Sequence, residues 1–170
     1  GDKIRDKDAV LSALLACEIG FIAKNNNKIF FDLLIDCYKK YGFFLEELIS
    51  YTKNGENGSK IISNTIKNYR NNPPNKIAGI DVEFFEDYNT SIIHNLISGN
   101  NEIIKLPKSN VIIFRLIDSS MIAIRPSGTE PKIKFYISVN NKFNSNESWS
   151  SQKNILEEKI KLIKNEFINL

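Results

Sequence analysis

The sequence predicts an α+β fold in which helices pack on one face of an antiparallel sheet, with two further helices in front of it. From residue 43 onward, short runs rich in Ile, Val and Phe alternate with two amphipathic helical stretches. Two of these runs, "NVIIFRLI" and "MIAIR", flank the tight turn "DSS", which is typical of a β-hairpin. The segment before residue 43 is helical and far more apolar.

The N-terminal segment is predicted to form two helices. Asp6 is the expected N-cap of a helix over residues 8–24, whose apolar side chains cover nearly its whole circumference. The run "NNN" ends this helix, and a second helix over residues 28–41 stops at Gly42 as a C-cap. A helix that is apolar all round is normally buried on several sides.

These two helices are too apolar to form a unit alone. We therefore expect residues 1–42 to be the end of one domain and residues 43–170 to form a second. The chain opens on "GDKIRDKDAV", without an initiator methionine and with a helix about to begin, which indicates a piece of a longer protein. Self-association through residues 8–41 is another way to cover the apolar surface.

The second domain is predicted to follow the order β-α-β-β-β-β-α. Residues 87–108 are a polar excursion to which no element is assigned. The expected elements are, in order, a strand at 43–52, a helix at 55–72, a strand in "KIAGIDVEFFEDY", hairpin strands at 110–117 and 121–125, a strand at 132–139 and a helix at about 148–168.

The composition is that of a globular protein, since 42% of the 170 residues are hydrophobic and 25% are charged. No apolar run approaches the roughly 18 residues that span a bilayer, and no signal peptide is apparent, so we expect a cytoplasmic protein without membrane contact. A net charge of +3 suits a protein that handles small anions and is too mild for a nucleic-acid binder. Cys17 and Cys37 lack metal-ligand spacing and are expected to be reduced core residues.

The stretch "RPSGTEP" after the hairpin collects more anion-binding groups than a turn needs. Arg125 offers a planar fork of donors to two phosphate oxygens, and Ser127 and Thr129 add hydroxyl donors. Gly128 lets backbone N–H groups come close to an anion. Its replacement by alanine should block that approach or a φ > 0 conformation.

The strand that follows adds positive charge. Lys132 and Lys134 are two apart and therefore point to the same face, and with Arg125 they give a local charge of +3. Glu130 is expected to pair with a lysine or to cap loop amides. The pattern predicts a phosphate site, and a polar hairpin loop with solvated charges is the alternative that the residues leave open.

No other segment suggests a catalytic constellation. His94, the only histidine, is expected to be a surface residue rather than a base. Asp2, Asp6 and Asp8 could form a carboxylate cluster for a metal, but N-capping and the helix dipole explain them better. The sequence therefore predicts no catalytic residue and no metal ligand in this chain.

The stretch "RPSGTEPKIKFY" closely resembles the phosphate-binding loop in the C-terminal domain of the α-D-phosphohexomutases, the phosphoglucomutase/phosphomannomutase family. The opening "GDKIRDKDAV" is similar to a segment of the family's third domain. The resemblance implies that residues 1–42 end the third of four domains and that residues 43–170 are the fourth, a TATA-binding-protein-like domain. "KIKFY" after "RDKDA" favours the phosphoglucomutase, phosphomannomutase or phosphopentomutase branch over phosphoglucosamine mutases.

The resemblance implies an isomerase that moves a phosphoryl group between the 1- and 6-positions of a hexose phosphate through a phosphoserine and a bisphosphate intermediate. It also implies Mg²⁺ held by aspartates of the second domain and a glucose 1,6-bisphosphate-type activator. The phosphoserine setting, the metal loop and the sugar loop are absent from this sequence. This chain alone is therefore expected to be inactive, to bind the non-reacting phosphate and to close the cleft, with the upstream domains and the sugar phosphate as its partners.

The family pattern also implies roles for single residues. The residues that match the family's phosphate contacts are Arg125, Ser127, Gly128, Thr129 and Lys134, and Lys132 is a further expected contact on the same face. Lys7, in "RDKD", matches a lysine that contacts the sugar phosphate in some members, and a solvated lysine is the alternative.

Two rival functions remain at this stage. One is a stand-alone module that binds phosphate or a sugar phosphate without catalysis. The other, nucleic-acid binding through the sheet, is disfavoured because basic and aromatic residues do not interleave in a stripe. Which sugar phosphate would be used, glucose, mannose or pentose, is left open.

Overall fold

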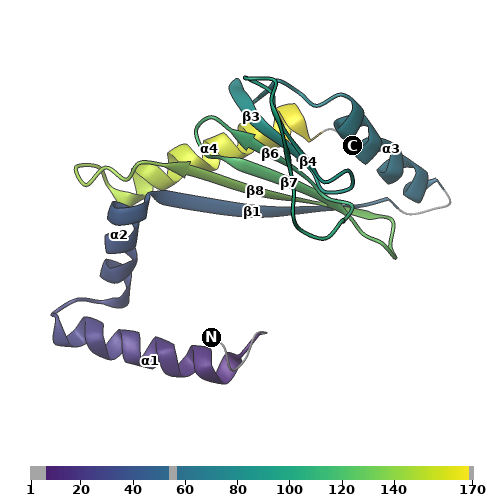
Figure 1. Cartoon of the computed structure of the whole chain (residues 1–170). Coiled ribbons are helices and arrows are strands. Elements are labelled where there is room, and N and C mark those ends of the chain that lie inside the picture. Colours follow the sequence, from purple (N-terminus) through teal and green to yellow (C-terminus); the bar gives the residue numbers. More distant parts are fainter. Residues whose placement is uncertain (1–6, 54–56, 169–170) are drawn as a thin grey trace. The chain divides into compact units, whose positions relative to one another are not determined.

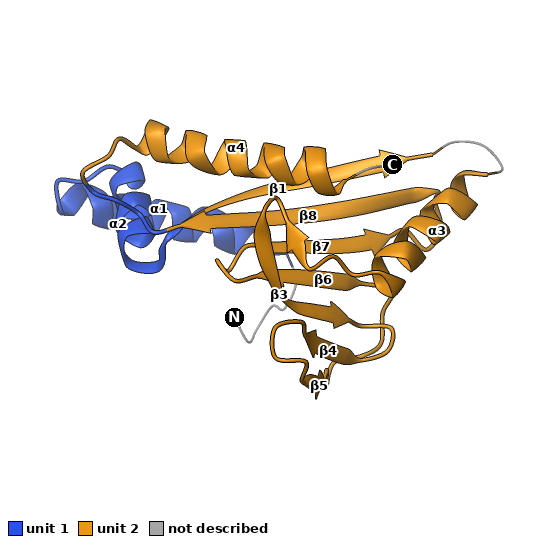
Figure 2. Cartoon of the chain, turned by 90° about the horizontal axis from the view of Figure 1, so that it is seen from above, with its two compact units in different colours: residues 1–43, 142–145 blue, residues 44–141, 146–170 orange. Residues whose placement is uncertain are grey.

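The computed structural model describes residues 7–53 and 57–168. The chain divides into two compact units, one of residues 1–43 with 142–145 and one of residues 44–141 with 146–170 (Figure 2). Among the described residues, no helix has the length and apolar character needed to cross a membrane.

The first unit holds helices α1 (Ala9–Asn25) and α2 (Phe30–Tyr41) (Figure 1). The N-cap of α1 is Asp8, whose Oδ1 accepts a hydrogen bond from the Leu11 amide at 2.9 Å. The expectation of Asp6 as the N-cap was wrong by two residues, and Asp6 itself lies outside the described residues. Gly42 caps α2 as expected, with a φ of 97° that favours glycine.

Most apolar side chains of the first unit are exposed. In α1 only Ala23 is buried, while Val10 is 83% exposed. Cys17 and Cys37 are free and exposed, so the expectation that they are core residues was wrong. The reason is that the apolar surface of the helices that carry them is not covered in this structure.

The second unit is built on one sheet with the strand order β1-β8-β7-β6-β3-β4-β5, with β2 paired to β3. The fold class predicted from the sequence, α+β with an antiparallel sheet, is confirmed. The strands are β1 (Phe43–Thr52), β2 (Lys76–Ile77), β3 (Ile80–Asp87), β4 (Ile92–Asn95), β5 (Asn101–Ile103), β6 (Ile112–Leu116), β7 (Met121–Pro126) and β8 (Lys132–Asn141), and the helices are α3 (Gly58–Asn71) and α4 (Trp149–Phe167).

The segment 87–108 is more regular than the sequence indicated. It contains β4 and β5, which pair with each other and extend the sheet beyond β3. These strands were missed because they span only four and three residues and carry His, Asn and Glu in place of a clear apolar alternation.

The sheet has one face covered by helices and one open face. Ile133, Phe135 and Ile137 of β8 are fully buried, and they alternate with Lys132, Lys134 and Tyr136. Helix α3 contacts β7 and β8, helix α4 contacts β8, and both helices lie on the same side of the strands (Figure 1). The period of two in β8 therefore sends its apolar side chains into the core and its basic side chains to the open face.

Polar contacts from two neighbouring residues, Tyr69 and Arg70, hold α3 in place. The Tyr69 hydroxyl donates to the Phe167 carbonyl at 2.6 Å, and burial raises the pKa of Tyr69 to about 12, so the group stays a neutral donor. Arg70 Nε lies 3.0 Å from Oδ1 of Asp87, whose side chain is only 3% exposed. Arg70 Nη2 also donates to Asn110 Oδ1 at 3.0 Å. Helix α3 is thus tied both to α4 and to the end of β3.

The Asp87 carboxylate should be a main polar contributor to stability. Replacing it by alanine leaves the Arg70 guanidinium without its buried partner and removes hydrogen bonds to the Asn89 amide and the Thr90 hydroxyl. We expect Asp87→Ala to lower the free energy of unfolding by about 3–5 kcal/mol in urea denaturation. Asp81→Ala, which breaks the exposed pair with Lys76, is the matched control and should cost less than about 1 kcal/mol. Equal costs would refute this role.

The exposed apolar helices of the first unit should promote association. The full chain is expected to form dimers or larger species as its concentration rises, because contact between chains removes the exposed apolar side chains of α1 and α2 from water. A variant that begins at residue 43 should remain monomeric over the same range in sedimentation velocity. If the two proteins sediment as monomers alike, these helices do not drive association.

Candidate functional site

The site predicted from the sequence lies at the turn between β7 and β8. Arg125 and Lys134 are directly paired across these strands, and the next pair is Pro126 with Ile133. Paired residues share a face of the sheet, so both cations project from the open face. Within the described residues, neither side chain forms an ion pair. Like charges placed directly opposite destabilise a sheet, which makes an anion the favourable neighbour here.

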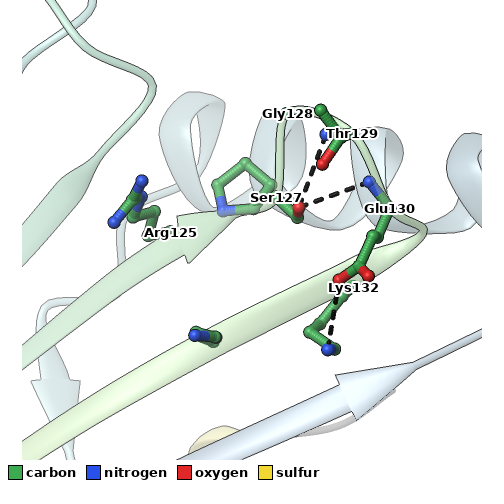
Figure 3. A pocket seen from close by; sticks show the side chains of 8 residues that line it. Arg125, Ser127, Gly128, Thr129, Glu130 and Lys132 are labelled. Atoms are coloured by element: carbon green, nitrogen blue, oxygen red, sulfur yellow. Dashed lines mark hydrogen bonds and ion pairs between the residues drawn. The ribbon is translucent and has the colours of Figure 1, made fainter.

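The loop between the strands is shaped by its own hydrogen bonds. The Ser127 amide donates to the Lys132 carbonyl at 2.7 Å. The Ser127 hydroxyl oxygen accepts from the amides of Thr129 at 3.4 Å and Glu130 at 3.3 Å (Figure 3). A hydroxyl that accepts twice still has its own proton to donate. Ser127 can therefore brace the loop and donate to an anion at once.

The backbone conformation of Gly128 differs from the one expected from the sequence. Its φ is not among the positive values of the described residues, so the part of the prediction that invoked φ > 0 was wrong. A Cβ built on Gly128 meets no atom within 4 Å, because the residue borders open space. Among the described residues, the Gly128 amide donates to no acceptor. The amide remains available to a ligand that comes close.

Glu130 pairs with a lysine, which is one of the two roles expected for it from the sequence. Its Oε2 lies 3.2 Å from Nζ of Lys132, and Figure 3 shows this contact below the loop. The carboxylate is 61% exposed and the lysine side chain 31% exposed. Lys132 is thus the loop cation whose charge is already balanced.

These residues surround one pocket of about 340 Å³. It is lined by Arg125, Pro126, Ser127, Gly128, Thr129, Glu130, Lys132 and Lys134. The structure therefore brings together all six residues of the loop and strand that the sequence predicted to contact phosphate. Pro126 and Glu130 are additional lining residues.

A second hollow lies between the same loop and α3. Ser59 and Ser63 of α3 line it together with the loop from Pro126 to Pro131. Sequence reasoning missed this backing of the loop by α3, because α3 ends at Asn71, far before Pro126 in the sequence, and no local pattern links the two segments.

The other candidate residues lie elsewhere. Lys7 precedes α1 in the first unit and is exposed. His94 is half-buried on β4, stacks on Phe85 at 5.8 Å between ring centroids and has Nδ1 2.8 Å from Asn101 Oδ1. Asp2 and Asp6 lie outside the described residues, and no group of three or more His, Cys, Asp or Glu side chains in the described part could hold a metal ion.

The chain is similar to bacterial phosphoglucomutases. It is 41% identical over 136 residues to the phosphoglucomutase of Staphylococcus aureus strain MSSA476, a match that covers 80% of this chain and 24% of the relative. It is 36% identical over 135 residues to the phosphoglucomutase of Staphylococcus saprophyticus, covering 79% of this chain and 24% of the relative. No family model matches the chain.

The fold is shared with a solved structure. The crystal structure of pp63/parafusin from Paramecium, titled an exocytosis-sensitive phosphoprotein and a phosphoglucomutase in its open form, superposes with a TM-score of 0.56 at 16% identity. The match covers 96% of this chain and 28% of that protein. The chain thus spans about a quarter of the length of the relatives that it matches.

Proposed function

Because this chain belongs to the α-D-phosphohexomutase family, we propose that it supplies the phosphate-binding part of a phosphoglucomutase-type isomerase. The observation that carries the proposal is the cross-strand pair of Arg125 and Lys134 at a pocket that also holds two hydroxyls and a glycine amide. These are the donors that a tetrahedral dianion requires.

In the proposed reaction, a phosphoryl group moves between the 1- and 6-positions of a hexose phosphate through a phosphoserine and a bisphosphate intermediate. This chain would bind the phosphate that is not reacting and would close the cleft over the sugar. Binding a remote phosphate orients the reacting end, and the binding energy can be used to lower the barrier of the chemical step. Residues 1–42 would belong to one domain of such an enzyme and residues 43–170 to the next.

Each residue has a proposed role. The Arg125 guanidinium offers two parallel N–H donors to two phosphate oxygens. Lys134 and Lys132 add positive charge from the same face, and the Ser127 and Thr129 hydroxyls donate from the loop. Lys7 is proposed, on the family pattern alone, as a contact to the sugar phosphate.

Mg²⁺ would balance phosphate charge in an enzyme of this kind. The described residues of this chain do not provide a carboxylate cluster that fits the ion.

Arg125 should dominate phosphate binding. Titration of the full chain with inorganic phosphate is expected to shift amide resonances of residues 125–134, with a dissociation constant in the millimolar range, about −4 kcal/mol. Arg125→Ala should abolish these shifts while the rest of the spectrum persists. Arg125→Lys should weaken binding although it keeps the charge, because the planar fork is lost. Added salt should weaken binding in the wild type, since the site is open.

Lys105→Ala is the control for this titration, because it removes an exposed cation that does not line the pocket. It should leave the shifts and the dissociation constant unchanged. Shifts that scatter over surface lysines, or that survive Arg125→Ala, would show that the loop is only a turn.

Gly128→Ala should separate binding from folding. The added methyl group meets no protein atom, so the free energy of unfolding is expected to change little. Phosphate affinity should fall about tenfold, because a methyl group beside the free amide blocks one charge-assisted hydrogen bond. Chemical denaturation and the same phosphate titration measure the two quantities. Unchanged affinity would mean that the anion does not approach the loop at Gly128.

A further inference from the structure

Positive side chains outnumber negative ones around the pocket. Three cations, Arg125, Lys132 and Lys134, line it together with one carboxylate, that of Glu130. Glu130 contacts Lys132 at 3.2 Å. Among the described residues, Arg125 and Lys134 have no anionic partner. One of the three positive charges is thus neutralised from within the loop.

The backbone of Glu130 is fixed while its side chain is not. The Glu130 amide donates to the Ser127 hydroxyl oxygen at 3.3 Å, and the Glu130 carbonyl accepts from the Lys132 amide at 2.7 Å. The carboxylate is 61% exposed, and within the described part of the chain Lys132 Nζ is its only polar partner. It can therefore turn into solvent by side-chain rotation without breaking any of the hydrogen bonds that shape the loop.

We propose that the Glu130 carboxylate is a placeholder for the phosphate of the ligand. In the empty site it holds Lys132, and in the occupied site the phosphate takes over Lys132 while the carboxylate turns outward. This inference rests on the proposed function, because it concerns the same pocket. Glu130 would then set the affinity and selectivity of the pocket for anions, because its carboxylate competes with the ligand for Lys132.

Competition of this kind favours dianions. A monoanion that takes over Lys132 replaces one negative charge by another at that residue. A phosphate dianion can satisfy Lys132 and still supply charge to Arg125 and Lys134, which the carboxylate does not contact. Glu130 therefore disfavours singly charged anions more than phosphate.

The test is a phosphate titration of Glu130→Gln in the full chain, followed by amide chemical shifts. Removing the carboxylate should tighten phosphate binding about fivefold, which corresponds to the upper end of what an exposed ion pair contributes. A gain in affinity is not the result of structural damage, so this readout differs from that of a residue that merely shapes the loop. Glu102→Gln is the matched control, since Glu102 is exposed on β5, which β6, β3 and β4 separate from β7.

A second background isolates the role of Lys132. When Glu130→Gln is added to Lys132→Gln, the contact between the two side chains is already gone. The addition should therefore change phosphate affinity no more than Glu102→Gln changes it in the wild type. We therefore expect Glu130→Gln to raise phosphate affinity only when Lys132 is present.

The outcomes separate the two proposals. If the wild type and Glu130→Gln both fail to bind phosphate, the proposed function is wrong and this inference falls with it. If the wild type binds through Arg125 but Glu130→Gln binds equally or more weakly, or gains affinity equally in the Lys132→Gln background, only the placeholder role is wrong.

Discussion

The antiparallel register of β7 and β8 is the constraint on which the site depends. Ile124 pairs with Phe135, and both are fully buried under the helices. The next pair, Arg125 with Lys134, must then face the opposite way, because side chains alternate along a strand. A slip of one residue would send Lys134 into the core and Phe135 to the open face. The apolar core thus enforces a placement of two like charges that neither strand would favour alone.

The loop also depends on contacts behind it. Ile62 and Ile66 of α3 are buried, and they line the hollow between this helix and the loop. The position of α3 is fixed in turn by the Arg70–Asp87 ion pair and by the hydrogen bond from Arg70 to Asn110. On the other side, the Lys53 amide donates to the Pro131 carbonyl at 2.9 Å. The pocket therefore has a braced backbone, while Arg125 and Glu130 are exposed to solvent and Lys132 and Lys134 are half-buried.

Much of this arrangement could be read from the sequence, and the failures have physical reasons. The hairpin and β8 were predictable because their alternation and turn residues are local signals. The strands β4 and β5 lack such signals. They are linked by a side-chain contact between His94 and Asn101, which sequence periodicity does not predict. Burial of Cys17 was wrongly expected because apolarity shows which surface favours burial, and it does not show what covers that surface. The pairing of Glu130 was left open since both a lysine and the loop amides lay within reach.

The open pocket proposed here to bind phosphate is suited to holding a group rather than to reacting with it. Solvent screens the charges of exposed side chains, so each contact contributes less than it would in a closed cleft. The pocket provides donors and positive charge, and among its lining residues there is no histidine or cysteine and only one carboxylate, already paired with Lys132. Such a site gains strength when water is excluded from it, because every charge–charge contact then acts at a lower dielectric constant. Under the proposed function, closure over a sugar phosphate would therefore strengthen anion binding at this pocket, and opening would weaken it again.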